Sequence, residues 1–525
     1  MAFFQDAPVL ANLYTQDAFL RAEFARRVPK DICQAQSKFL ENLGHQSVTQ
    51  YSLWQDEADK NPPTLTQFDA WGRRMDRINE ARHWQDFRQA AVEWQIVGRG
   101  HSKDLGPFAR VVQTAYMLLF APTTANYLCP LAMTDAAACV VRRLAPPSLK
   151  ERLYGRLIAK DSAQAITSGQ WMTERPGGSD VSRTETLAHY QTHVGEEARF
   201  RLYGVKWFTS SISSEMALLL AQVMEDKTPK GLTLFCWERP DMPGSSPKSR
   251  VKVLRLKDKL GTRALPTAEI ELDGTLVSQI GEIGRGVSHI AEMLNVTRFY
   301  NAVASAASMN FSSLLVEDYG RRRQAFGRPV GEHALMKEVQ RDLQTQSAAA
   351  TALCFEVASL LGKCEVGDAS RDEQLCMRAM VPLAKLLLGK ATVAHASETL
   401  ECFGGAGYIE DTGLPRILRD AQVLPIWEGT TNVLALDLWR AERKEGAVSA
   451  LVAKLITRSE TLLRGGSSEV KELCAAAQTL RQTVERLLSQ SEEEAQRQLR
   501  RLAFDLGASL QKLLLLEHAA SDTRA

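Results

Sequence analysis

The chain has 525 residues, which is long enough for about three or four domains. Its composition, 45% hydrophobic and 24% charged, is typical of a folded soluble protein with a sizeable core. The 64 basic and 62 acidic residues give a net charge of +2. So small a net charge gives no indication of a polyanionic partner.

The cysteines and the first residues bear on the cellular compartment. Nine cysteines form no CxxC pair and do not cluster with the nine histidines along the sequence, which predicts reduced, mostly buried thiols and no metal site. The N-terminus carries Asp6, Asp17 and Glu23 and lacks a basic segment followed by an apolar one, so we expect no secretory signal. We expect an intracellular, cytoplasmic protein; a mitochondrial or peroxisomal location stays open.

Residues 1–165 have the pattern of a helical domain. Phe68, Trp71, Met75 and Ile78 recur at three- and four-residue spacing, which predicts an amphipathic helix. The longest uncharged run, 111–134, contains two prolines, so it predicts a buried helix pair with a turn and no membrane span.

The period changes near residue 166, and 166–282 reads as a middle domain of antiparallel β-strands. Short β-rich runs carry alternating apolar residues, such as Leu232, Leu234 and Cys236, and are separated by turns such as Asp273-Gly274. Two segments of this domain carry side chains that could bind a ligand. In 170–180 a strand runs into a glycine turn with hydroxyl groups on either side, and in 206–210 an aromatic pair precedes Thr209. The first segment could bind a polar ring or a pyrophosphate, or it could be an ordinary loop. The aromatic pair of the second could pack against a ring to which Thr209 donates a hydrogen bond, or it could belong to an ordinary packed strand.

Residues 283–445 return to long helices with small residues, typical of a helical bundle, and 446–525 form a helical tail. Arg298 falls inside an apolar helix, so its guanidinium needs an acidic partner or an anionic ligand. The basic cluster at 321–329, RRRQAFGRP, is either a solvated helix end or a site for adenine and diphosphate.

The stretch 401–432 contains a glycine-rich turn, 404–407, and a single carboxylate, Glu428, between Trp427 and Gly429. A lone glutamate is most often a solvated surface residue. Here Ile426 and Trp427 are apolar and should draw the carboxylate toward the interior, where it is suited to accept a proton.

Six segments in this order resemble the flavin-dependent acyl-CoA dehydrogenase family, and within it the AidB-like branch of alkylation-response flavoproteins. They are MTERPGGSD at 172–180, KWFTS at 206–210, the Arg298 helix, RRRQAFGRP at 321–329, ECFGGAGY at 401–408 and RDAQVLPIWEGTTN at 419–432. The segments at 61–78 and 256–263 resemble the AidB-like branch in particular. The resemblance implies an α+β fold with an N-terminal helical domain, a middle β-domain and a C-terminal four-helix bundle. It also implies FAD as cofactor, with no metal, and a homotetramer built as a dimer of dimers.

The resemblance also assigns roles to single residues. Glu428 matches the catalytic base, and Arg298 matches an arginine near the acyl-CoA. Positions along the flavin ring are matched by Met172, Thr173, Trp207, Phe208, Thr209 and Ser210, and Ser179 matches a position that touches flavin or CoA. Arg323 and Phe326 match residues that hold the ADP half of FAD across a subunit interface, and the other cofactor positions are Gly405, Ile426, Trp427, Gly429, Thr430 and Asn432. One departure is Glu401, where most of the family has a glutamine near the diphosphate.

These roles imply an enzyme of fatty acid metabolism that dehydrogenates an acyl-CoA thioester between its α and β carbons. Glu428 would remove the α-proton, its backbone N–H would stabilise the thioester carbonyl, and the β-hydride would pass to flavin N5. Thr297 stands beside Arg298, where some members carry the base, which favours Glu428. The electron acceptor and the acyl chain length stay open.

The alternative is a flavoprotein with little turnover that binds acyl-CoA or duplex DNA in a protective or regulatory role. The tail carries an amphipathic pattern, with Val470, Leu473 and Leu480 among its apolar positions, suited to packing on another helix. From 465 to 525 it has eight basic and nine acidic residues. Because duplex binding rests on phosphate neutralisation, a formal charge of −1 speaks against a DNA-binding tail.

Overall fold

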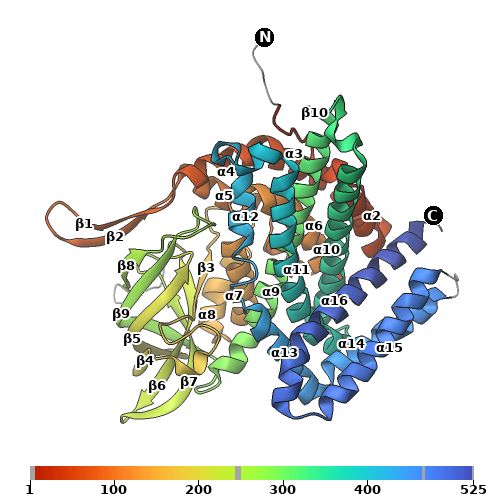
Figure 1. Cartoon of the computed structure of the whole chain (residues 1–525). Coiled ribbons are helices and arrows are strands. Elements are labelled where there is room, and N and C mark those ends of the chain that lie inside the picture. The colour runs from red at the N-terminus through yellow and green to blue at the C-terminus, as the bar shows by residue number, and fades with distance from the viewer. Residues whose placement is uncertain (1–5, 243–249, 464–466, 523–525) are drawn as a thin grey trace. The chain divides into compact units, whose positions relative to one another are not determined.

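The structure is a computed structural model that describes residues 6–242, 250–463 and 467–522 (Figure 1). The chain forms two compact units that cut across the four segments expected from the sequence. The sheet unit contains Tyr51–His101 and Thr123–Tyr300. The helical unit contains Met1–Gln50, Ser102–Pro122 and Asn301–Ala525.

A seven-stranded sheet with the order β3-β5-β4-β6-β7-β9-β8 dominates the sheet unit. Its strands are β3 (Ser168–Trp171), β4 (Leu187–Val194), β5 (Glu197–Ser210), β6 (Met216–Glu225), β7 (Thr228–Glu238), β8 (Lys252–Leu256) and β9 (Thr267–Ile280). The sheet is mixed, since β6 runs parallel to both β3 and β4, whereas the sequence predicted antiparallel strands throughout. Apolar alternation identifies a strand but does not give the direction of its neighbour.

One apolar cluster holds this sheet together, and its largest members are aromatic. The rings of Trp171 and Trp237 lie 4.7 Å apart, and those of Phe200 and Phe235 lie 5.2 Å apart. All four side chains are buried. Trp171 ends β3, so this cluster fixes the start of the segment 172–180 that carries candidate site residues.

The prediction of an amphipathic helix over Phe68–Ile78 is wrong. These residues form a β-hairpin of β1 (Thr64–Phe68) and β2 (Arg74–Asn79), which extends as a narrow ribbon in Figure 1. Only Ile78 and its strand partner Leu65 pack on the sheet cluster, and Trp71 at the tip is 94% exposed. The helical spacing was therefore coincidental, because Phe68, Trp71 and Met75 are exposed and form no buried helix face.

Helices complete the sheet unit. They are α4 (Ser52–Lys60), α5 (Arg82–Glu93), α7 (Leu128–Leu144), α8 (Pro147–Leu157) and the first part of α9 (Gly286–Arg322). The expected helix pair with a turn in 111–134 is confirmed, since α6 (Ala109–Phe120) and α7 are separate and mostly buried helices.

The helical unit is built from long helices of the second half of the chain. They are the rest of α9, α10 (Ala334–Val366), α11 (Arg371–Cys402), α12 (Leu414–Ala421), α13 (Thr431–Glu445), α14 (Ala447–Leu463), α15 (Ser468–Leu488) and α16 (Glu492–Asp522). The helices α1 (Leu13–Gln16), α2 (Ala18–Arg27), α3 (Lys30–Gln46) and α6 pack with them, and α10 and α11 run side by side (Figure 1). Among the described helices, α10 alone is long and apolar enough to span a membrane, but 78% of that apolar window is buried inside the protein.

The tail packs as the sequence predicted. The apolar positions of α15 are buried, from Val470 and Leu473 to Leu487, and α15 contacts both α14 and α16. A buried ion network joins this region to the rest of the bundle, because Glu356 of α10 pairs with Arg27 of α2 and with Arg458 of α14. Burial raises the pKa of Glu356, but the two guanidinium charges outweigh burial and lower the pKa to about 2.

Candidate active site

Glu428 lies on a tight turn between α12 and α13. Its backbone has φ +55°, which is uncommon outside glycine, and Gly429 follows with φ +102°. The side chains of Trp427 and Glu428 are half-buried, but Ile426 is 60% exposed. The sequence predicted that both apolar neighbours draw the carboxylate inward; Ile426 does not, because its own side chain faces outward.

Two helices hold the backbone around this turn. Asn301 of α9 donates from Nδ2 to the carbonyl oxygen of Leu424 at 3.2 Å, and Lys385 of α11 donates from Nζ to the carbonyl oxygen of Gly429 at 2.6 Å. Gly389 of α11 lies against the same segment, since an added Cβ would stand 2.9 Å from the Leu424 oxygen. None of these three residues was predicted from the sequence. A lysine within the apolar run 381–388 was the available signal.

The turn leads into α13, whose first turn begins at Thr431 with Thr430 as N-cap. Thr431 is buried and Asn432 is exposed. Asn432 accepts at Oδ1 a hydrogen bond of 2.9 Å from Arg500 of α16. The candidate residues 428–432 are therefore contiguous with the start of a 15-residue helix, where backbone N–H groups favour negative charge.

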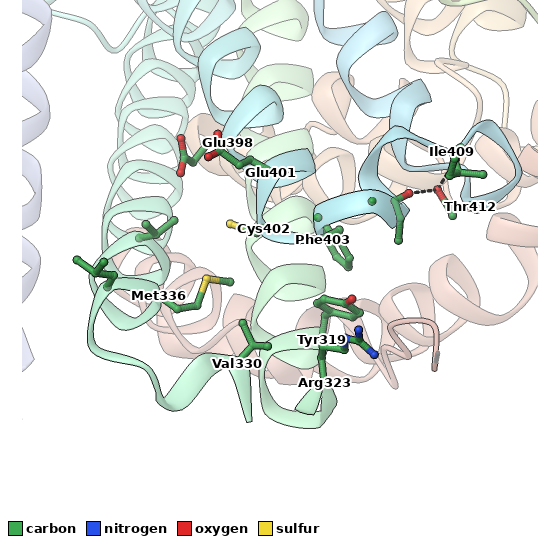
Figure 2. Close-up of a pocket in the computed structure, with 15 residues that line it drawn as sticks. Tyr319, Arg323, Val330, Met336, Glu398, Glu401, Cys402, Phe403, Ile409 and Thr412 are labelled. Atoms are coloured by element: carbon green, nitrogen blue, oxygen red, sulfur yellow. Dashed lines mark hydrogen bonds between the residues drawn. The ribbon is translucent and has the colours of Figure 1, made fainter. Parts of the chain in front are cut away.

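A second group of candidate residues lines an open pocket of about 820 Å³ within the helical unit. Its walls come from the end of α9, the start of α10, the end of α11 and the glycine-rich turn after it (Figure 2). Figure 2 shows Tyr319 and Arg323 on one side of the opening and Glu398 and Glu401 on the opposite side. The lining also includes Val330, Leu335, Met336, Val339, Cys402, Phe403, Gly404, Gly405, Ala406, Ile409 and Thr412.

The pocket has a cationic and an anionic side. Burial raises the pKa of the Cys402 thiol, and the carboxylates of Glu398 and Glu401 raise it further, to about 12. Gly405 has open space where a Cβ would stand, so the chain leaves room for a ligand there. Phe326 is not part of the lining: it sits on the β10 (Gln324–Ala325) and β11 (Arg328–Pro329) hairpin with φ +52° and is 94% exposed.

The sheet unit carries the remaining candidate residues on two neighbouring segments. Met172 is buried, Thr173 is half-buried and Ser179 is exposed. Thr173 and Gly178 are in close contact across the glycine turn, since an added Cβ on Gly178 would lie 2.7 Å from Thr173 Oγ1. The carbonyl oxygen of Thr173 accepts a hydrogen bond of 2.8 Å from the backbone N–H of Trp207, which brings 172–180 and 206–210 together.

The aromatic pair of the second segment lies among cations. Lys257 Nζ is 3.5 Å from the ring centre of Trp207 and 4.5 Å from that of Phe208. Phe208 is 46% exposed and Ser210 half-buried, so both can contact a ligand. Thr209 is fully buried and its hydroxyl donates to the carbonyl oxygen of Ala268 at 2.8 Å. Donation from Thr209 to a ring stays a prediction, since in this structure the hydroxyl proton goes to the Ala268 carbonyl oxygen.

A buried cluster of ionisable side chains in the sheet unit escaped the sequence analysis. Ligand atoms of His101, Asp135 and Cys139 lie within 4.8 Å of one another. The Asp135 carboxylate accepts hydrogen bonds from His101 Nε2 at 3.0 Å and from the Tyr300 hydroxyl at 2.8 Å. The spacing of cysteines and histidines along the sequence does not reveal this group, because His101 lies 34 residues before Asp135. All nine cysteines are free thiols.

Arg298, the candidate near an acyl-CoA, is buried in α9, as its apolar neighbours predicted. Thr297 beside it is also buried.

Comparison with known proteins assigns the chain to a family. Residues 6–163 match the adaptive response protein AidB N-terminal domain, 169–275 the acyl-CoA dehydrogenase middle domain, and 284–442 the acyl-CoA dehydrogenase C-terminal domain. Acyl-CoA dehydrogenase family member 11 of Caenorhabditis elegans is 35% identical, over 100% of this chain and 86% of the relative. The chain belongs to the acyl-CoA dehydrogenase family.

Two further similarities place it in the AidB-like branch. The putative acyl-CoA dehydrogenase AidB of Escherichia coli is 32% identical over 85% of this chain and 80% of the relative. The crystal structure of Caenorhabditis elegans ACDH-11 in complex with C11-CoA superposes with a TM-score of 0.93 and 35% identity, covering 100% of this chain and 90% of that structure. The fold is thus the acyl-CoA dehydrogenase fold, and the chain is an FAD-dependent oxidoreductase of this family.

The residues of the helical-unit pocket fit the ADP half of FAD. Arg323 supplies a cation for a diphosphate, the open space at Gly405 admits it close to the backbone, and Val330, Met336 and Val339 supply an apolar surface for an adenine. Glu401 lines the same pocket, and its carboxylate would oppose a diphosphate electrostatically.

Proposed function

We propose that this protein dehydrogenates an acyl-CoA thioester between its α and β carbons, with Glu428 as the base. The observation that carries the proposal is the position of Glu428: a half-buried carboxylate on a backbone turn held by α9 and α11, directly before α13. Because two helices fix this turn, the carboxylate is held in a single position. General base catalysis requires a base that is held at a fixed position relative to the proton it removes.

The residues of this chain have separate tasks in that reaction. Glu428 accepts the proton from the α carbon as the C–H bond breaks, and the electron pair forms the new double bond as the β-hydrogen leaves as a hydride. The backbone N–H of Glu428 stabilises the negative charge that develops on the thioester carbonyl oxygen. Bound FAD supplies the acceptor of the hydride. Met172, Thr173, Trp207, Phe208 and Ser210 orient the flavin ring, supported by the closeness of their two segments.

An acyl-CoA is the substrate class that the relatives support. ACDH-11, 35% identical to this chain, was solved with C11-CoA. Arg298, a buried cation on α9, supports binding of a thioester with an anionic CoA portion.

We infer that the working form is a homotetramer, in which a second copy covers the pocket of the helical unit. Large apolar side chains are exposed at this pocket and on the segments that flank it: Phe326 is 94% exposed, Tyr408 88% and Leu335 84%. Exposed apolar side chains gathered in one area favour a protein interface. This arrangement supports a site in which one copy binds the ADP half of the FAD whose ring another copy holds.

The tail gives little support to the alternative of a duplex-binding flavoprotein. Arg497 pairs with Glu493, Arg501 with Asp505, and Lys512 with Glu472. These basic groups lie beside carboxylates on α15 and α16, so they offer phosphates little net positive charge.

The test is the substitution Glu428→Gln, which keeps the shape and removes the base. We expect the variant to retain FAD and to lose the acyl-CoA-dependent bleaching of the flavin absorbance, measured anaerobically by stopped flow with a panel of acyl-CoAs that includes the eleven-carbon thioester. Glu445→Gln, at the other end of α13, is the matched control and should bleach like the unchanged protein.

Bleaching of undiminished rate in Glu428→Gln would remove Glu428 as the base. A yellow, folded wild-type protein that no acyl-CoA bleaches, but that binds duplex DNA with a steep dependence on salt, would instead favour the alternative flavoprotein with little turnover.

A further inference from the structure

Lys385 is a fully buried lysine in the middle of α11. Its side chain has 0% exposure, and it stands in an apolar run between Ala384 and Leu386. Lysine is rarely buried unless its ammonium is paired, because removing the charge from water costs several kcal/mol. A methionine or leucine would fill the same space without that cost, so packing alone does not account for a lysine here.

The ammonium of Lys385 reaches the turn that carries Glu428. Nζ donates to the carbonyl oxygen of Gly429 at 2.6 Å, a short charge-assisted hydrogen bond. That carbonyl belongs to the residue directly after Glu428. The bond therefore fixes the orientation of the peptide group on the C-terminal side of the turn, while Asn301 holds Leu424 on its N-terminal side.

The turn needs such support. A non-glycine residue at φ +55° is strained, and such strain persists only where surrounding contacts determine the conformation. Gly429 adds a second left-handed residue, with φ +102°. Without a donor at its carbonyl, the peptide after Glu428 would be free to rotate, and the carboxylate would move with it.

We propose that Lys385 is a positioning residue for Glu428: its buried ammonium anchors the Gly429 carbonyl and so holds the carboxylate where it meets the α-proton of the substrate. This inference rests on the proposed role of Glu428 as the base. The contact that carries the proposal is with the backbone, from Lys385 Nζ to the Gly429 carbonyl oxygen. A misplacement of about 1 Å in a catalytic group costs on the order of 100-fold in rate, so the anchor should appear in the chemical step.

The experiment compares Lys385→Met, which keeps the length but removes the donor, with Lys385→Arg, which keeps a charged donor. The matched control is Lys390→Met, since Lys390 is an exposed lysine on the same helix. For each purified holoprotein we would measure the flavin content, the visible flavin spectrum, and the rate of anaerobic flavin bleaching as a function of acyl-CoA concentration.

In Lys385→Met we expect the limiting bleaching rate to fall at least tenfold, with an apparent Kd for acyl-CoA within about threefold of wild type and an unchanged flavin content. Lys385→Arg should recover part of the rate, and Lys390→Met should behave like wild type. A purely structural lysine would instead lower the flavin content or the unfolding temperature and leave the rate per bound flavin unchanged, which would overturn the proposal.

A second variant keeps the inference testable if Lys385→Met does not fold. Gly429→Ala places a Cβ at φ +102°, 3.0 Å from Leu434 Cδ2, and so displaces the same peptide group with Lys385 intact. It should show the same loss of limiting rate, and a wild-type rate would count against an anchored turn. Glu428→Gln separates the two claims. If it bleaches normally, Glu428 is not the base and the positioning role falls with it; if it is inactive while Lys385→Met is fully active, only the positioning role fails.

Discussion

Lys206 and Glu174 form an ion pair inside the sheet unit, with Lys206 Nζ and Glu174 Oε1 2.5 Å apart. Each residue belongs to one of the two segments that the sequence singled out for the flavin ring. Glu174 also accepts hydrogen bonds from the backbone N–H of Glu185 and from the Thr186 hydroxyl, and Lys206 donates to the Leu220 carbonyl oxygen. Burial lowers the pKa of Lys206, and the charge of Glu174 opposes that effect. The pair thus links the two candidate ring-binding segments.

Removing one partner of this pair should affect both stability and cofactor binding. Lys206→Met leaves the Glu174 carboxylate buried without its cation, so we expect the free energy of unfolding of the apoprotein to fall by about 3–5 kcal/mol. The affinity for FAD should fall at least tenfold, because Thr173 and Trp207 lose their fixed spacing. Urea unfolding and quenching of flavin fluorescence measure the two effects. In Lys206→Met with Glu174→Gln most of the stability should return; if it does not, the loss in the single variant had another cause than an unpaired charge.

The ion network of Glu356 predicts an acid-sensitive bundle. The pKa of Glu356 is lowered from 4.5 to about 2 in the folded protein, so its contribution to stability is complete above about pH 4.5 and is lost as the pH falls toward 2. At pH 7, Glu356→Gln should lower the free energy of unfolding by about 3–5 kcal/mol, since Arg27 and Arg458 lose their shared carboxylate. The difference between variant and wild type should shrink steadily in urea titrations from pH 5 to pH 3. A difference independent of pH would show that the charge of Glu356 is not what stabilises the bundle.

Two glycines of the same short segment should respond in opposite ways. An added Cβ at Gly405 meets nothing within 4 Å, whereas one at Gly407 would lie 2.0 Å from the Leu400 carbonyl oxygen. We expect Gly405→Leu to leave the unfolding free energy of the apoprotein within about 0.5 kcal/mol and to weaken FAD binding at least tenfold, because its side chain enters the pocket. Gly407→Ala should instead destabilise the apoprotein by about 1–3 kcal/mol. Equal FAD affinity in Gly405→Leu and wild type would mean that the pocket does not hold the cofactor.

The exposed aromatic of the β10–β11 hairpin links assembly to cofactor binding. If a second copy covers this area, Phe326→Ser should weaken self-association and, at the same protein concentration, release FAD. Light scattering coupled to size-exclusion chromatography, with flavin absorbance recorded on the same column, follows both quantities. Phe39 of α3 is also exposed, at 55%, and Phe39→Ser serves as control. A tetramer that persists in Phe326→Ser with full flavin content would place the interface elsewhere.

The sequence predicted the fold class and the packing of the tail because long apolar periods decide both. It failed at Phe68–Ile78, where a helical spacing occurs in a hairpin whose tip is exposed, and at the direction of β6, which alternation does not encode. Most candidate residues were predicted from the order of the six motifs and their resemblance to the family. Tertiary packing sets the contacts between distant residues, such as Lys385 with Gly429 and His101 with Asp135. No local sequence pattern predicts them.

The contact between Glu23 of α2 and His518 of α16, 2.7 Å from carboxylate to ring, spans almost the entire chain. During synthesis, α2 emerges early, whereas His518 of its partner helix follows 495 residues later. Until α16 has been made, the Glu23 carboxylate lacks its contact with His518, and Arg458 of α14 lacks its partner Glu517. Loss of α16, by a premature stop codon or a protease, would therefore remove a contact of α2 as well as the packing of α14 and α15.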